Sequence, residues 1–215
     1  MTLFVECPFC HKRVLKWFFA AHQAKHTRRG VDGQMQDHIN EREEDRYSGS
    51  LDGVPMWYRH EVCGKTTGMP EDIVRSYLAN PFLYTSRTFC SGCRDYVHMS
   101  ECFWRETGES VIAYRRNLMR KVLANKDLVR VSFRTIQEIK AWMHARGALD
   151  SPLRITLKRE GESIGITGLF HSRFDPECDW QGDYNGLKVL VNLDEVARYV
   201  HDRELIFHSD QLALQ

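Results

Sequence analysis

Apolar and polar positions alternate most regularly in the last third of the chain. Short apolar runs bounded by Gly, Asn and Asp predict β-strands, because successive strand residues point to opposite faces of a sheet. We expect strands over residues 129–132, 153–158, 164–171, 187–191 and 205–208. Thr135 and Glu138 have the spacing of a capping box, which predicts a helix that Gly147 ends. Asn192 and Glu195 predict the start of a second, shorter helix.

Helical patterns also occur in the middle of the chain, on either side of several cysteines. Pro70, followed by two acidic residues, is typical of a first helical turn. Residues 109–124 predict a basic amphipathic helix. Residues 30–56 are polar, acidic and dotted with glycine, and they lack an apolar period, so we interpret them as a linker.

These patterns together predict an α+β multidomain protein, with small metal-stabilised modules ahead of a mixed α/β domain. The expected parts are a finger (1–29), a polar acidic linker (30–56), a ribbon (57–104), a basic connecting helix (105–125) and the α/β domain (126–215).

Charge is distributed in blocks, although the net charge is only +1. Residues 1–30 carry six Lys or Arg against one acidic residue, whereas residues 31–52 carry seven acidic residues against two basic ones. Because the whole chain is not basic, solvated faces or contacts between segments of opposite charge explain the blocks better than a dedicated nucleic-acid surface. The chain has no signal-peptide pattern and no apolar run of membrane-spanning length, which predicts a soluble, cytoplasmic protein without a membrane partner.

The first metal-binding pattern lies in residues 1–29. Cys7 and Cys10 are followed by His22 and His26, with the spacing C-x2-C-x11-H-x3-H. A tight turn can supply the two thiolates, and one helix face can supply both imidazoles, since residues four apart lie one turn above each other. Zinc prefers four such ligands in a tetrahedron, and a unit this small needs the metal in order to fold. The segment resembles the two-Cys two-His zinc finger, but it has one residue fewer than usual between Cys10 and His22.

The second pattern contains more candidate ligands than one ion can take. Its preferred set, His60, Cys63, Cys90 and Cys93, forms two x2-spaced pairs that resemble a zinc ribbon. His98 and Cys102 are alternative ligands, because together with Cys90 and Cys93 they also make a four-residue set. The sequence therefore predicts about two zinc ions per chain and leaves the ligands of the second open.

Two other chemistries can use the same residues. Four thiolates, from Cys63, Cys90, Cys93 and Cys102, can hold an iron–sulfur cluster, although their spacing does not match a ferredoxin run. A zinc deaminase would need one residue between its histidine and its glutamate, whereas Glu61 directly follows His60. We therefore favour zinc in a structural role and expect no catalytic residues.

The α/β domain carries a further resemblance. The stretches LRITLK (153–158), IGITGLF (164–170) and GLKVLVNLDEVARY (186–199) resemble the A-type iron–sulfur carriers, the HesB/IscA-like family. The resemblance implies that fold. The turn at residues 161–165 has no cysteine, however, and the chain lacks the family's Cys-Gly-Cys tail, so the ligands of a carrier are missing.

From these features we expect a zinc-binding adaptor or interaction protein, with an accessory role in iron–sulfur or metal handling as the alternative. Its partner is either a protein or a nucleic acid. Contacts to phosphates would come from basic residues of the finger and of the connecting helix. These residues are Lys12, Arg13, Lys16, Arg28 and Arg29 in the finger, and Arg115, Arg116, Arg120 and Lys121 in the helix.

Overall fold

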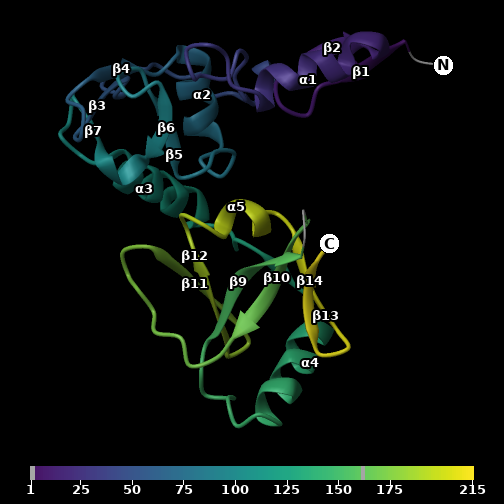
Figure 1. Ribbon diagram of the computed structural model, residues 1–215. Coiled ribbons are helices and arrows are strands. Elements are labelled where there is room, and N and C mark those ends of the chain that lie inside the picture. Colours follow the sequence, from purple (N-terminus) through teal and green to yellow (C-terminus); the bar gives the residue numbers. More distant parts are fainter. Residues whose placement is uncertain (1–2, 161–162) are drawn as a thin grey trace. The chain divides into compact units, whose positions relative to one another are not determined.

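The computed structural model describes residues 3–160 and 163–215, which form two compact units, Met1–Leu118 and Met119–Gln215. The division falls inside helix α3 (Val111–Leu123), ahead of the boundary that the sequence pattern placed at residue 126. The architecture is mixed α and β, with small sheets and few helices (Figure 1). In the part of the chain that is described, no helix is long and apolar enough to cross a bilayer.

The first unit begins with a hairpin and a helix. Strands β1 (Phe4–Glu6) and β2 (Arg13–Leu15) pair antiparallel, and a 3-10 turn (Lys16–Phe18) leads directly into α1 (Phe19–Thr27). Within residues 3–30 the buried side chains are those of Cys7, Cys10 and His26. The interior of this segment is therefore made of its candidate metal ligands, with no apolar core beside them.

The segment between the finger and the ribbon is held by backbone hydrogen bonds. The Asp37 N–H donates to the Lys25 carbonyl at 3.2 Å, and the Asn40 N–H donates to the Phe9 carbonyl at 2.8 Å. On the other side, the Met35 N–H donates to the hydroxyl of Tyr96 at 3.3 Å. Residues 35–40 thus pack against both neighbours, because their polar groups find partners there instead of water.

The rest of the first unit is a small sheet, a hairpin and two helices. The sheet has the order β4 (Thr66–Gly68), β3 (Trp57–His60), β7 (Cys102–Trp104), and the hairpin pairs β5 (Arg87–Cys90) with β6 (Asp95–His98). Helix α2 (Glu71–Ala79) starts one residue later than predicted, because Pro70 is its N-cap and not its first helical residue. The core beneath these elements consists of Tyr58, Met69, Val74, Met99, Cys102, Trp104, Val111 and Ile112.

Helix α3 forms where the sequence predicted a basic connecting helix, but one of its arginines is fully buried. The Arg115 guanidinium donates to the carbonyl oxygens of Pro81 at 3.1 Å and Tyr84 at 2.6 Å. Arg115 ties the loop after α2 to the helix. The expectation that it faces phosphates is wrong, because a fully buried side chain cannot reach a ligand in solvent.

The second unit contains two sheets. The four-stranded sheet has the order β10 (Ser163–Leu169), β9 (Leu153–Glu160), β12 (Leu187–Asn192), β11 (Asp179–Tyr184), and β12 runs parallel to β9. The three-stranded sheet has the order β14 (Gln211–Leu214), β13 (Glu204–His208), β8 (Arg130–Val131). Helix α4 (Phe133–His144) packs beside β13, and the short helix α5 (Ala197–Val200) follows β12 (Figure 1).

The sequence predicted the strands β9, β10, β12 and β13 and the left-handed Gly147, which has φ 67°. It missed β11 and β14, and it placed the start of α4 three residues late. Ser132 is the N-cap, since its Oγ accepts the Thr135 N–H at 3.2 Å. Thr135 is already helical, so its pairing with Glu138 as a capping box was wrong.

Candidate metal centres

The first cluster joins the β1–β2 turn to α1. Cys7 and Cys10 lie in the turn, while His22 and His26 lie one helical turn apart on α1. The Cys10 Sγ is 3.3 Å from the His22 Nε2, and the Nε2 atoms of the two histidines are 3.4 Å apart. All four ligand atoms lie within 4.8 Å of one another. The four residues proposed from spacing are thus brought together.

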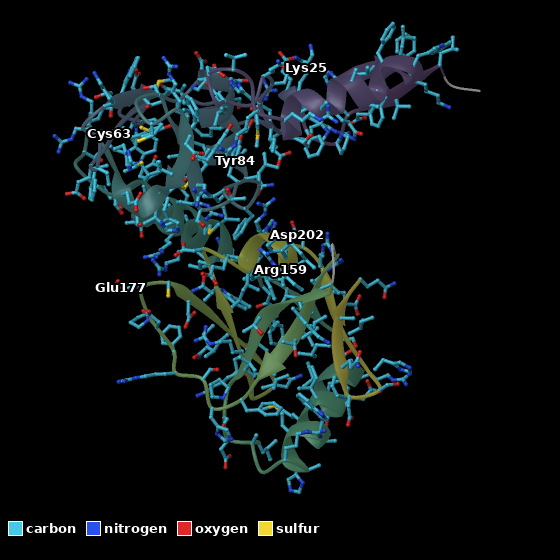
Figure 2. The ribbon with its side chains drawn as sticks, viewed as in Figure 1. Lys25, Cys63, Tyr84, Arg159, Glu177 and Asp202 are labelled. Carbon is cyan, nitrogen blue, oxygen red and sulfur yellow. The ribbon has the colours of Figure 1, made fainter. Side chains whose placement is uncertain are left out.

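The second cluster joins two turns that are far apart in sequence. His60 and Cys63 flank the turn after β3, and Cys90 and Cys93 flank the turn after β5. The His60 Nδ1 is 3.3 Å from the Cys63 Sγ and 3.4 Å from the Cys93 Sγ, and the sulfurs of Cys63 and Cys90 are 3.4 Å apart. Figure 2 shows sulfur atoms gathered around the labelled Cys63.

These separations fit one metal ion in each cluster. A zinc-sized ion with bonds of about 2.0–2.3 Å to nitrogen and sulfur sets its tetrahedral ligands about 3.3–3.8 Å apart. The five distances given above lie between 3.3 and 3.4 Å, at the short end of that range. Both groups are therefore able to hold a metal ion.

All three ligand-bearing turns share one backbone geometry. The N–H four residues after the first ligand donates to that ligand's carbonyl, from His11 to Cys7 at 2.9 Å and from Gly64 to His60 at 2.8 Å. The third turn repeats this bond from Arg94 to Cys90 at 2.8 Å. The donor residues are left-handed, with φ of 59°, 69° and 53° respectively. For His11 and Arg94 this conformation costs about 1–2 kcal/mol, so the turns hold their ligands at some cost to the backbone.

The two exposed thiols of the second cluster have opposite pKa shifts, since burial raises the pKa of Cys93 to about 12. The Lys65 backbone N–H is the main cause that lowers the pKa of the Cys63 thiol to about 6. At neutral pH this favours the thiolate, which is the form that binds metal. By contrast, burial raises the pKa of Cys102 to about 12, which favours its neutral thiol.

The ring nitrogen of His60 that faces away from the cluster has a carboxylate partner, Glu101. The His60 Nε2 lies 3.4 Å from a Glu101 carboxylate oxygen, while the Nδ1 faces the cluster. A histidine that binds metal through one ring nitrogen commonly donates its other N–H to such a carboxylate, which fixes the tautomer and the ring orientation. The sequence analysis missed Glu101, because only the pairing of β3 with β7 brings it beside a residue 41 positions away.

The alternative ligands lie outside both clusters. The His98 Nδ1 bonds to the Ser100 hydroxyl at 2.7 Å and caps the short 3-10 turn before β7. Cys102 is buried in the core with Tyr58 and Trp104. Neither residue joins a group of ligand atoms in the described part of the chain.

The basic residues of the finger have different surroundings. Lys12, Lys16 and Arg28 are exposed, whereas the guanidinium of Arg13 lies over the ring of Phe4, 5.4 Å from its centroid. Arg29 points to the ribbon: its Nη1 is 2.7 Å from the Asp95 carboxylate, and its guanidinium carbon lies 5.7 Å from the ring centroid of Tyr96. Arg29 is thus engaged within the first unit, and the remaining residues offer scattered positive charge.

Comparisons of the chain with protein-family models, with curated proteins and with solved structures find no significant match.

Proposed function

We propose that this protein is an adaptor whose first unit is held together by two structural zinc ions. The observation that carries the proposal is that each cluster is a complete set of four thiolate or imidazole donors. Catalytic zinc sites keep three protein ligands and leave the fourth position to water, whereas structural sites are closed by four. In this proposal residues 7–26 form a zinc finger and residues 60–93 form a zinc ribbon.

The donor chemistry supports zinc over other metals. Two Cys with two His, and three Cys with one His, are common donor sets of structural zinc. An iron–sulfur cluster favours four thiolates. The remaining cysteine near the ribbon cluster, Cys102, is buried in the apolar core and does not belong to the group of ligand atoms.

The finger helix favours an interaction role over base recognition. In DNA-reading fingers, positions −1, 3 and 6 of the helix contact bases. Counted from Lys16, these positions hold Leu15, Phe18 and Ala21. Counted from Phe19, they hold Phe18, Ala21 and Ala24. Neither set contains a polar side chain that hydrogen-bonds to a base edge, so sequence-specific DNA reading is not part of the proposal.

For the second unit we propose the HesB/IscA-like fold, as a scaffold without the family's metal ligands. The support is that the three resembling stretches include β9, β10 and β12, which are neighbours in one sheet. The cysteine of this unit, Cys178, lies next to Asp175, with 3.2 Å between the thiol and the carboxylate. A lone thiol does not hold a cluster.

Cobalt substitution of the full chain tests the closed-site proposal. We expect elemental analysis of the purified protein to find about two zinc ions, with Cys7→Ser and Cys90→Ser each losing about one. The Co²⁺ form should show the visible bands of tetrahedral cobalt, and added azide or cyanide should leave them unchanged. A spectrum that shifts with azide would reveal an open, catalytic type of site. Visible absorption of the protein as purified, together with bound iron, would favour the alternative role in iron–sulfur handling.

A further inference from the structure

The solvent face of the finger is apolar at one end and basic at the other. Trp17 is 68% exposed and Phe18 is 63% exposed, where the 3-10 turn enters α1. Leu3 and Phe4, at 57% and 44%, lie at the same end, because the Lys16 N–H donates to the Leu3 carbonyl at 3.1 Å. Large apolar side chains this exposed and this close together mark an interaction site more often than isolated ones do.

The helix continues this face away from its metal ligands. Ala20 and Ala21 follow Phe18 and are exposed, and Lys25 and Arg28 come one and two turns further along. Phe18, Ala21, Lys25 and Arg28 are spaced at three, four and three residues, so they form one stripe along the helix. His22 and His26 each follow a stripe residue directly, so they lie about 100° further round the helix, on the neighbouring face that holds the cluster. Figure 2 labels Lys25 on α1.

We propose that this stripe, together with Leu3, Phe4 and Trp17, binds an acidic amphipathic helix of a protein partner. The inference rests on the proposed adaptor function and names its partner by chemistry. Ala21 projects little from α1, so a second helix can approach the stripe closely there and place apolar residues against Trp17 and Phe18. Its acidic side chains then meet Lys25, Arg28 and Lys16, which are exposed cations along and beside the stripe.

Charge complementarity is the reason for choosing an acidic partner. The finger contains one acidic residue, Glu6, and that residue is occupied by Arg42 at 2.7 Å and by His11 at 3.0 Å. The exposed residues of the stripe are therefore basic or uncharged, although Asp37 of the following segment lies beside Lys25, hydrogen-bonded to its carbonyl. Opposite charges on a partner speed association and set its orientation. Helix-in-groove recognition reads its anchors at positions i, i+3, i+4 and i+7, and the stripe has the related spacing i, i+3, i+7 and i+10.

The residue composition of this face favours a protein partner over a nucleic acid or a lipid surface. Aromatic side chains can stack on bases, but a nucleic-acid groove also needs a continuous track of cations. Here Arg29 is engaged with Asp95, and Arg13 lies over Phe4. Within the stripe, Ala21 offers neither a phosphate contact nor an anchor of much apolar area in a bilayer.

The test uses the zinc-loaded full chain and a display library of helical peptides with randomised surface positions. We expect the enriched peptides to carry apolar residues at i, i+3 or i+4, and i+7, flanked by Asp or Glu. Fluorescence anisotropy of one enriched peptide, made synthetically, then gives its affinity. A dT15 oligonucleotide and vesicles of phosphatidylserine and phosphatidylcholine are the competing probes.

Matched variants decide whether the named face is the site. Trp17→Ala should weaken peptide binding at least about tenfold, as expected for a central aromatic anchor. Lys25→Glu should weaken it several-fold, more at low salt than at high salt. Trp57→Ala, at a ribbon tryptophan that is 55% exposed, is the control and should leave affinity unchanged. Bound zinc, measured for each variant, should stay at the wild-type level.

The inference is overturned if the library yields no acidic amphipathic peptide, if Trp17→Ala binds the enriched peptide as wild type does, or if dT15 or the vesicles bind more tightly than the peptide through Trp17. Failure of the adaptor proposal is separately visible. In that case the cobalt spectrum shifts with azide, whatever the peptides do.

Discussion

The first thirty residues and the second unit solve the same physical problem in different ways. In residues 3–30 the buried side chains are Cys7, Cys10 and His26. In residues 119–215 they include a set of fully buried apolar residues: Leu128, Ile139, Met143, Leu153, Ile155, Leu190, Leu193 and Leu205. Short segments bury too little apolar area to offset the entropy of ordering, and metal coordination replaces that area.

The ribbon stands between these extremes. It has a cluster of its own and also a core around Tyr58 and Trp104, whose rings pack edge to face with centroids 5.7 Å apart. The comparison therefore predicts a gradient of metal dependence, which is strongest in the finger, intermediate in the ribbon and absent in the second unit.

Metal removal should have the largest effect. Chelation of the full chain should abolish hydrogen-exchange protection in α1, reduce it in β5 and β6, and leave β9 and β12 protected. Binding of structural zinc contributes about 10–16 kcal/mol to the folding of zinc-finger peptides, far more than any single contact in the finger. Loss of protection in β9 on chelation would break the comparison.

A core substitution should affect the second unit alone. Ile155→Ala should lower the free energy of unfolding of that unit by about 2–5 kcal/mol, because it opens a cavity at a fully buried position. Bound zinc should not change. Ile164→Ala, at a position 47% exposed on the neighbouring strand, is the matched control and should cost much less. Urea unfolding followed by circular dichroism measures both, and zinc loss in Ile155→Ala would contradict the separation.

Removing the Glu101 carboxylate should lower the metal affinity of the ribbon without unfolding it. Glu101→Ala should lower metal affinity at the second cluster by about 10–100-fold, since the imidazole loses the partner that orients it. Glu61→Ala removes a neighbouring carboxylate that is exposed, and it should have little effect. Competition with a chromophoric chelator measures both variants, and equal affinities would show that Glu101 does not position His60.

The smallest effect is expected where the finger meets the ribbon. Arg29→Ala removes an ion pair with Asp95 in which both side chains are about half exposed, so it should cost no more than about 1 kcal/mol. The difference from wild type should shrink at about 1 M salt, where such pairs are screened. If thermal unfolding showed that the first unit loses several kcal/mol of stability, this ion pair would contribute as much as a buried core residue.

Much of the candidate chemistry was readable because it depends on local spacing. The Cys-x-x-Cys and His-x3-His pairs are fixed by turns and by one helical turn, so each pair is brought together by its own few residues. The strands β9, β10 and β12 were readable from alternation, whereas β11 was not. Its sequence, DWQGDY, contains glycine and two aspartates, which disfavour strands, and pairing with β12 overrides that preference.

By itself, the sequence determined which pairs of ligands exist, where the finger helix and the predicted strands lie, and that the charges fall in blocks. Only the tertiary structure decided that His60 faces Cys63, Cys90 and Cys93 while His98 and Cys102 stay apart, and that Glu101 supports His60. It also decided that Arg115 is buried and that Arg29 pairs with Asp95. The physical reason is distance along the chain. Spacing constrains residues a few positions apart, whereas contacts across tens of residues depend on strand pairing and on how each core is filled.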